Sequence, residues 1–232
     1  MLVAIAWVSL SIAFLCALVI VIDEVRHPQS MGIMNAVWPI TALYLSVIGL
    51  WWYFRVGRTM ARNVAGSHAH MDHMQMHGGG NTLPTWPQSF LAGSHCGAGC
   101  ALADIVVEFA IFQSALTIAG SMLWASFVWD FIGAWSLGIV FQYFSIKPMR
   151  NLTVGQGIVA AIKADTLSIL AFQLGMYAWM ALVHFIFFPS PHLEPVSPVF
   201  WLMMQIAMVL GLLTTTPMNR WLVRTGLKEK MG

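Results

Sequence analysis

The sequence has very few charged residues. Lysine, arginine, aspartate and glutamate make up only 9% of its 232 positions, whereas hydrophobic residues make up 59%. A soluble globule of this size needs many more polar side chains to cover its surface. The composition therefore excludes an ordinary soluble protein and indicates a membrane protein.

The motifs of several enzyme and motor classes are also missing. The sequence contains no nucleotide-binding loop, no nucleophile elbow and no internal repeat, so nothing in it suggests an ATP-driven motor. The formal net charge of +2 does not indicate nucleic-acid binding, because the basic residues are those expected to orient membrane helices. Only three cysteines occur. On a reducing side of the membrane, the close pair Cys96 and Cys100 favours metal binding or redox chemistry over a structural disulfide.

Apolar runs long enough to cross a bilayer, which takes roughly 20 residues, occur six times. They cover residues 2–22, 31–54, 101–119, 122–146, 155–188 and 198–216. The first run lacks the positive start and the small-residue cleavage site of a signal peptide, so we treat it as a true span. The sequence predicts an all-α polytopic membrane protein with about six transmembrane helices, in which residues 1–232 form a single helical membrane domain.

The distribution of lysine and arginine predicts the orientation, because these residues gather in cytoplasmic loops. With six spans, nine of the 11 basic residues fall on one side, Arg26 lies on the other and Lys163 lies within a span. Both termini are then cytoplasmic, as is the long segment of residues 57–93. We predict that this segment is a flexible arm, since Pro84 and Pro87 discourage regular structure.

Within this arm, residues 67–80 read SHAHMDHMQMHGGG and concentrate side chains that bind soft metals. Imidazole and thioether ligands fit Cu(I) or Cu(II), with zinc and nickel as alternatives. A solvated tether that binds no metal is the other interpretation. The candidate ligands in this arm are His68, His70, Met71, His73, Met74, Met76 and His77.

A second cluster lies in the segment SHCGAGCALADIVVEF, residues 94–109, at the expected cytoplasmic edge of the third span. Cys96, Cys100, Asp104 and Glu108 recur every four residues, so a helix places them along one stripe. Together with His95, the cysteines offer thiolate and imidazole ligands that suit Cu(I) or Zn(II). Alternatively, the glycines and small cysteines only permit close helix packing.

Four acids and one base fall within the predicted spans, where charged groups are costly and usually functional. At about 1.5 Å per residue from the expected span ends, Glu108 and Lys163 come to similar depths, which predicts an ion pair between them. Such a pair is either purely structural or part of a relay. The five residues are Asp104, Glu108, Asp130, Lys163 and Asp165.

Two pairs of methionines share helix faces. Met176 and Met180 in the fifth span, and Met204 and Met208 in the sixth, are each four residues apart. A ladder of thioethers could pass a soft monovalent metal through the membrane. Ordinary packing or lipid contact is the competing interpretation.

The chain carries the motifs MNAVWPITALY, HCGAGCALADIVVE, FQYFSIKPMR, KADTLSILAF and MMQIAMVLGLLTTTPMNRWLVRTGLKEKM in this order, from about residue 31 to the C-terminus. In these motifs it resembles a bacterial integral-membrane family known only as domain-of-unknown-function 4396. The resemblance implies a polytopic helical protein and supplies no activity. The His/Met run lies outside these motifs. We expect the protein in the bacterial inner membrane.

Three hypotheses follow from these residues. The first is a membrane transporter or handler of a soft transition metal, copper favoured, whose arm and cysteine pair capture the ion on the cytoplasmic side. The second is a non-transporting scaffold or assembly factor that delivers metal to a membrane metalloenzyme. The third is an intramembrane enzyme with Asp104, Glu108 and Lys163 as acid/base groups, which no substrate-specific feature supports. The expected partners are the lipid bilayer, a metal ion, and either a second copy of the chain or a metalloenzyme, but no nucleic acid.

Overall fold

The computed structural model describes residues 1–29, 32–58, 86–146 and 153–226. Within these ranges the chain is helical without any β-strand, and five helices are long and apolar enough to cross a membrane. This confirms the predicted all-α polytopic membrane protein. The five are α1 Leu2–Arg26, α5 Trp86–Ser114, α6 Met122–Ile146, α7 Val154–Leu182 with its π-helical extension η2 Val183–Phe187, and α8 Pro198–Arg224.

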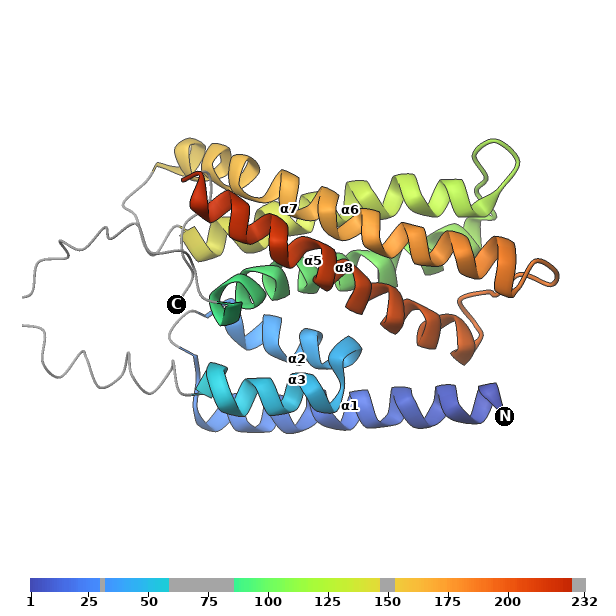
Figure 1. Cartoon of the computed structure of the whole chain (residues 1–232), viewed down its shortest axis with the longest axis horizontal. Coiled ribbons are helices and arrows are strands. Elements are labelled where there is room, and N and C mark those ends of the chain that lie inside the picture. The colour runs from blue at the N-terminus through green and yellow to red at the C-terminus, as the bar shows by residue number, and fades with distance from the viewer. Residues whose placement is uncertain (30–31, 59–85, 147–152, 227–232) are drawn as a thin grey trace, which may run out of the picture.

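The run predicted as the second span is instead a helical hairpin. It consists of α2 Met34–Leu45, α3 Val47–Trp52 and the π-helix η1 Tyr53–Gly57. Figure 1 shows α2 running toward the middle of the molecule and α3 returning beside it. With 12 residues, α2 is only about 18 Å long, whereas the hydrocarbon core of a bilayer is about 30 Å thick.

The turn of the hairpin is made by Ser46, which has a φ of 53°. Its amide donates to the Ala42 carbonyl at 2.8 Å and its carbonyl accepts from the Leu50 amide at 3.1 Å. A Cβ on Gly49 would lie 3.1 Å from the Ala42 Cα, so the two arms pack closely. The turn thus satisfies its own backbone, as irregular backbone at membrane depth must.

Because the hairpin returns to the end where it starts, the N-terminus and the C-terminal end of α8 lie at opposite ends of the molecule (Figure 1). This differs from the expectation that both termini share one side. The reason is that a hairpin lowers the number of candidate spans among the described residues from six to five without changing the hydropathy profile that predicted them.

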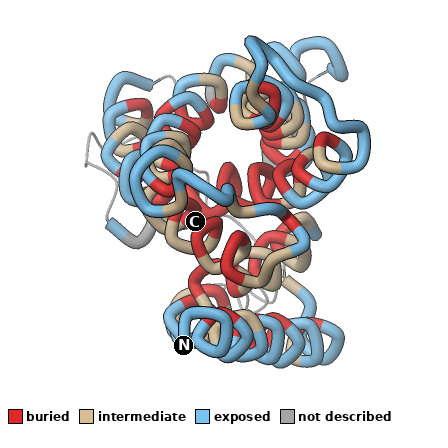
Figure 2. Tube along the Cα trace, turned by 90° about the vertical axis from the view of Figure 1, so that its right-hand side faces the viewer, coloured by how far each residue is buried: buried red, intermediate tan, exposed pale blue. Residues whose placement is uncertain are grey.

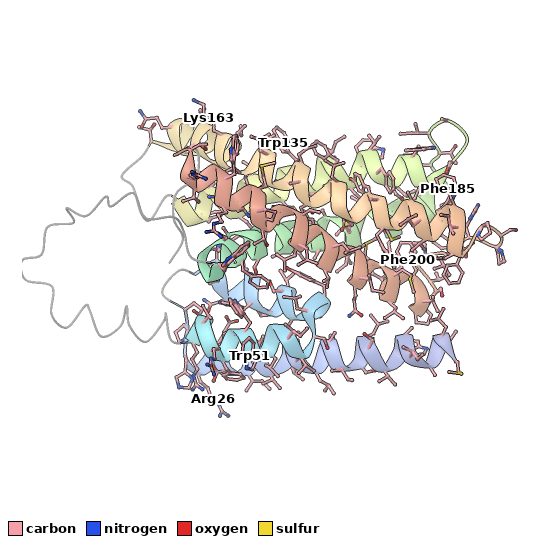
Figure 3. All side chains as sticks on the ribbon, viewed as in Figure 1. Arg26, Trp51, Trp135, Lys163, Phe185 and Phe200 are labelled. Atoms are coloured by element: carbon pink, nitrogen blue, oxygen red, sulfur yellow. The ribbon has the colours of Figure 1, made fainter. Side chains whose placement is uncertain are left out.

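The described basic residues gather at one end, which we call the basic end. Figure 3 labels Arg26 and Lys163 there. Arg58 lies 3.4 Å from Asp23, three residues before Arg26, and the Arg220 guanidinium lies 4.7 Å from the ring centroid of Trp86, the first residue of α5. Arg26, the one exception in the six-span arrangement, thus joins the other described basic residues.

The helices α5 to α8 form a bundle in which α5 packs on α6 and α8, and α7 packs on α6 and α8. Small residues permit this contact: a Cβ on Gly99 of α5 would lie 3.1 Å from the backbone nitrogen of Gly138 in α6. Figure 2 shows α1 at the side of this bundle, where it contacts α2 and α8.

The helix α5 begins earlier than the sequence suggests. The predicted arm covered residues 57–93, but α5 starts at Trp86. Pro87 lies in its first turn, where a proline is tolerated because no intrahelical partner awaits its missing amide. Residues 59–85, which include all seven candidate ligands of the His/Met run, lie outside the described residues.

Candidate functional site

A cavity of about 650 Å³ lies at the end of the bundle opposite the basic end. Figure 3 labels two of its wall residues, Phe185 and Phe200, at that end. Its walls come from all four bundle helices and from the segments that follow α5 and α7. We call it the acid–methionine cavity, after five of its wall residues: Glu108, Asp130, Met176, Met180 and Met204.

The two acids of this cavity form one unit. The side chains of Glu108 and Asp130 are hydrogen-bonded to each other, and Glu108 Oε2 also accepts from Ser126 Oγ at 3.0 Å. Ser126 and Asp130 are four residues apart on α6 and so share a face. A hydrogen bond between two carboxyl groups needs a proton on one of them. The pair therefore carries at most a single negative charge when bonded in this way.

All four methionines that the sequence singled out are buried. Met176, Met180 and Met204 bring thioethers from α7 and α8 to the acid–methionine cavity, while Met208 lines a second cavity that also includes Met204. The interpretation that these side chains face lipid is therefore wrong. Their grouping around a cavity results from the contact of α7 with α8, which the spacing of the pairs alone did not reveal.

The predicted stripe of Cys96, Cys100, Asp104 and Glu108 lies along the buried face of α5. Cys96 Sγ donates to Asp165 Oδ1 of α7 at 2.9 Å. Since α5 begins at Trp86, Cys96 lies about 15 Å along the helix and not at its edge. All three cysteines of the chain are free and buried.

His95, the remaining candidate of this cluster, is also buried, and its Nδ1 lies 3.1 Å from the Leu91 carbonyl oxygen. Its ring thus contacts the preceding turn of its own helix. Across the described ranges, no three side chains of His, Cys, Asp or Glu are grouped as a metal site.

The predicted ion pair between Glu108 and Lys163 is wrong. Both residues are described, and the ion pairs found among the described residues do not include it. Lys163 is exposed at the basic end, about 14 Å from the start of α7, whereas Glu108 lies about 33 Å from the start of α5. The predicted depth of Glu108 was wrong because the third span was expected to start at residue 101, whereas α5 starts at Trp86.

Two histidines at the mouth of the acid–methionine cavity were missed. The rings of His184, in η2, and His192, in the following segment, stack with centroids 3.8 Å apart, and both residues line the cavity. Tyr177, another wall residue, donates its hydroxyl to the Phe127 carbonyl at 2.6 Å. The sequence did contain a signal for this pair. His184 and His192 lie on either side of the predicted end of the fifth span at residue 188, and His184 follows Met180 by four residues on the same helix face.

A family model described as "Domain of unknown function (DUF4396)" matches residues 85–228. The matched region contains α5 to α8, and with them every residue that lines the acid–methionine cavity. No curated protein and no solved structure matches the chain.

Proposed function

The chain belongs to the domain-of-unknown-function 4396 family, which carries no assigned activity, and from its own residues we propose that it transports a soft monovalent metal cation, Cu(I) favoured. We place it in the bacterial inner membrane with the basic end toward the cytoplasm, because lysine and arginine mark the cytoplasmic side. The acid–methionine cavity then opens to the outside.

One observation carries this proposal: a single cavity brings together three thioethers and a hydrogen-bonded pair of acids. Thioether sulfur is a soft, neutral ligand that favours Cu(I) over Na⁺, K⁺ or Mg²⁺. When the acid pair has lost one of its two protons, its single negative charge balances one positive charge and lowers the electrostatic cost of holding a monovalent cation inside the membrane.

A series of groups leads from this cavity toward the basic end. Glu108, Asp104, Cys100 and Cys96 follow one another by one helical turn along the buried face of α5, over about 18 Å. The last of them contacts Asp165 of α7. Two carboxylates are followed here by two thiols on the buried face of α5, which suits the stepwise passage of a soft cation. The His/Met run then supplies a site for the ion on the cytoplasmic side.

The test is uptake of Cu(I), with Ag(I) as a surrogate that does not change oxidation state, into proteoliposomes containing the full-length protein. We expect saturable uptake by the wild type and at least a tenfold loss when Met176, Met180 and Met204 are all replaced by leucine. Leucine conserves side-chain volume, so the fold should be retained. The matched control is Met203→Leu, which alters a buried methionine of α8 that lines neither cavity.

The same experiment distinguishes transport from the scaffold hypothesis. Tight binding of Cu(I) without uptake would indicate a protein that holds metal for delivery to a metalloenzyme. Uptake that is equal in the triple variant and in Met203→Leu would show that the methionines only fill space, and the proposal would be wrong.

A further inference from the structure

A second cavity, of about 600 Å³, lies between α1 and the bundle, with walls from α1, α2, α5 and α8. We call it the lateral cavity. Trp7, Phe14, Leu15 and Ile105 line this cavity and are also exposed. Exposed apolar residues of membrane-spanning helices face lipid, so the lateral cavity is reached from the bilayer. Its volume is that of a site for a drug-sized molecule.

The wall of the lateral cavity includes an acidic residue whose carboxyl group has no hydrogen-bond partner among the described residues. Asp104 is fully buried, and in the part of the chain that the structure describes neither of its oxygens has a hydrogen-bond partner. Gln205, another polar wall residue, is satisfied, because it accepts from Ser9 at 2.9 Å and donates to the Leu43 carbonyl at 2.6 Å. A buried carboxyl without a partner is costly. A ligand that brought a positive charge to Asp104 would remove this cost.

The surrounding charges favour a cationic ligand. Asp104 lies one turn from Glu108, which is paired with Asp130, and Lys163, the base predicted to lie at the depth of Glu108, is exposed at the basic end instead. The lateral cavity also presents the aromatic rings of Trp7, Phe14 and Trp201. Aromatic rings attract cations through their faces, most strongly where water is absent.

We propose that the lateral cavity binds a hydrophobic organic monocation, with its apolar body between α1 and α8 and its positive charge at Asp104. The lateral access selects molecules that dissolve in the bilayer, and the acid selects those that are cationic among them. The walls of the two cavities share only Met204, and Asp104, which also belongs to the proposed metal route, is the residue at which the two proposals meet.

The test uses tetraphenylphosphonium as the probe and measures its binding to the full-length protein in nanodiscs by equilibrium dialysis. We expect saturable binding by the wild type and at least a tenfold weaker affinity in Asp104→Asn. Glu24→Gln is the matched control: Glu24 is also a buried acid whose oxygens have no partner in the described ranges, but it lines neither cavity. Its affinity should stay within twofold of the wild type.

A second variant guards against a folding effect at Asp104. Ser11→Trp places a large side chain in the lateral cavity from the lipid-facing helix α1 and should abolish binding without altering any acid. The neutral competitors are triphenylphosphine oxide and decylubiquinone. If they displace the probe as well as a second cation does, or if Asp104→Asn binds like the wild type, the site recognises shape and not charge, and the proposal is wrong. Absence of probe binding in a folded protein that still takes up Cu(I) would also refute it, and would leave the metal proposal intact.

Discussion

Substituting Gly97 tests how the hairpin meets the bundle. A Cβ at this position in α5 would lie 2.6 Å from the Tyr44 hydroxyl, 3.1 Å from Phe172 Cε2 and 3.3 Å from Tyr44 Cζ. Tyr44 belongs to the last turn of α2, next to the turn of the hairpin, and both aromatic residues are buried. The added methyl group therefore cannot be accommodated unless Tyr44 moves.

The magnitude follows from two opposing effects. Forcing an extra methyl group into a packed core costs about 1–3 kcal/mol, while alanine is favoured over glycine in a helix by about 1 kcal/mol. Gly97→Ala alone should thus destabilise the protein by about 0–2 kcal/mol. In a Tyr44→Phe background the closest atom is gone, so the same change should stabilise it by up to about 1 kcal/mol. The coupling energy between the two positions should be about 1–3 kcal/mol.

Reversible unfolding of the four proteins of this cycle in mixed micelles measures the coupling directly. Gly155→Ala is the control, because Gly155 lies near the start of α7 and a Cβ there meets no atom within 4 Å. It should not couple to Tyr44. A coupling energy for Gly97 below about 0.3 kcal/mol, within the additivity of independent sites, would refute the contact and with it the placement of the hairpin against α5.

The remaining predictions concern topology, charge, the cysteine pair and the arm. A tag at the N-terminus should be accessible from outside the cell and one after α8 only from inside, as epitope labelling of intact and permeabilised cells would show; both tags on one side would contradict the five-span arrangement. Glu108→Gln and Lys163→Met should change the free energy of unfolding additively, to within about 0.5 kcal/mol, because the two sites lie at different depths; rescue in the double variant would restore the ion pair. Cys96→Ser keeps a donor for Asp165, whereas Cys96→Val removes it and should be less stable by about 1–3 kcal/mol in the same unfolding assay; equal stability of the two variants would show that the bond contributes nothing. A peptide of residues 67–80 should bind copper with at least micromolar affinity, about 8 kcal/mol, by calorimetry; a scrambled peptide without His and Met that binds equally well would remove the arm from the mechanism.

The hydropathy of the sequence was sufficient to predict a helical membrane fold. It was misleading for one segment, which was predicted as a membrane span and is a short hairpin. Residues 31–54 are as apolar and as long as a span, and neither arm of the hairpin differs in composition from a membrane helix. The break occurs at Ser46, which is not a residue that signals a turn by itself. What determines the hairpin is close packing, of Gly49 on Ala42 and of Gly57 on the ring of Trp38, and packing partners are not visible in one sequence.

The candidate site was predictable to the level of helix faces. The spacing of four residues correctly identified the buried stripe of α5 and the shared faces of Met176 with Met180 and of Met204 with Met208. The depth of each residue was not predictable, because it depends on where a helix starts, and α5 starts 15 residues before the expected position. The pairing of Glu108 with Asp130 depends on the relative register of α5 and α6, which is set by contacts such as Gly99 on Gly138.

The short hairpin also imposes an order on biosynthesis. Arg26 lies in the last turn of α1, so in the proposed orientation this helix inserts with its last turn toward the cytoplasm. The two arms of the hairpin are each too short to remain in the bilayer alone, and the face that receives Tyr44 belongs to α5, which is synthesised only after the His/Met run. A nascent chain that stops before α5 would therefore hold the hairpin at the membrane surface. The hairpin would enter the membrane only when α5 has been synthesised and can pack against it.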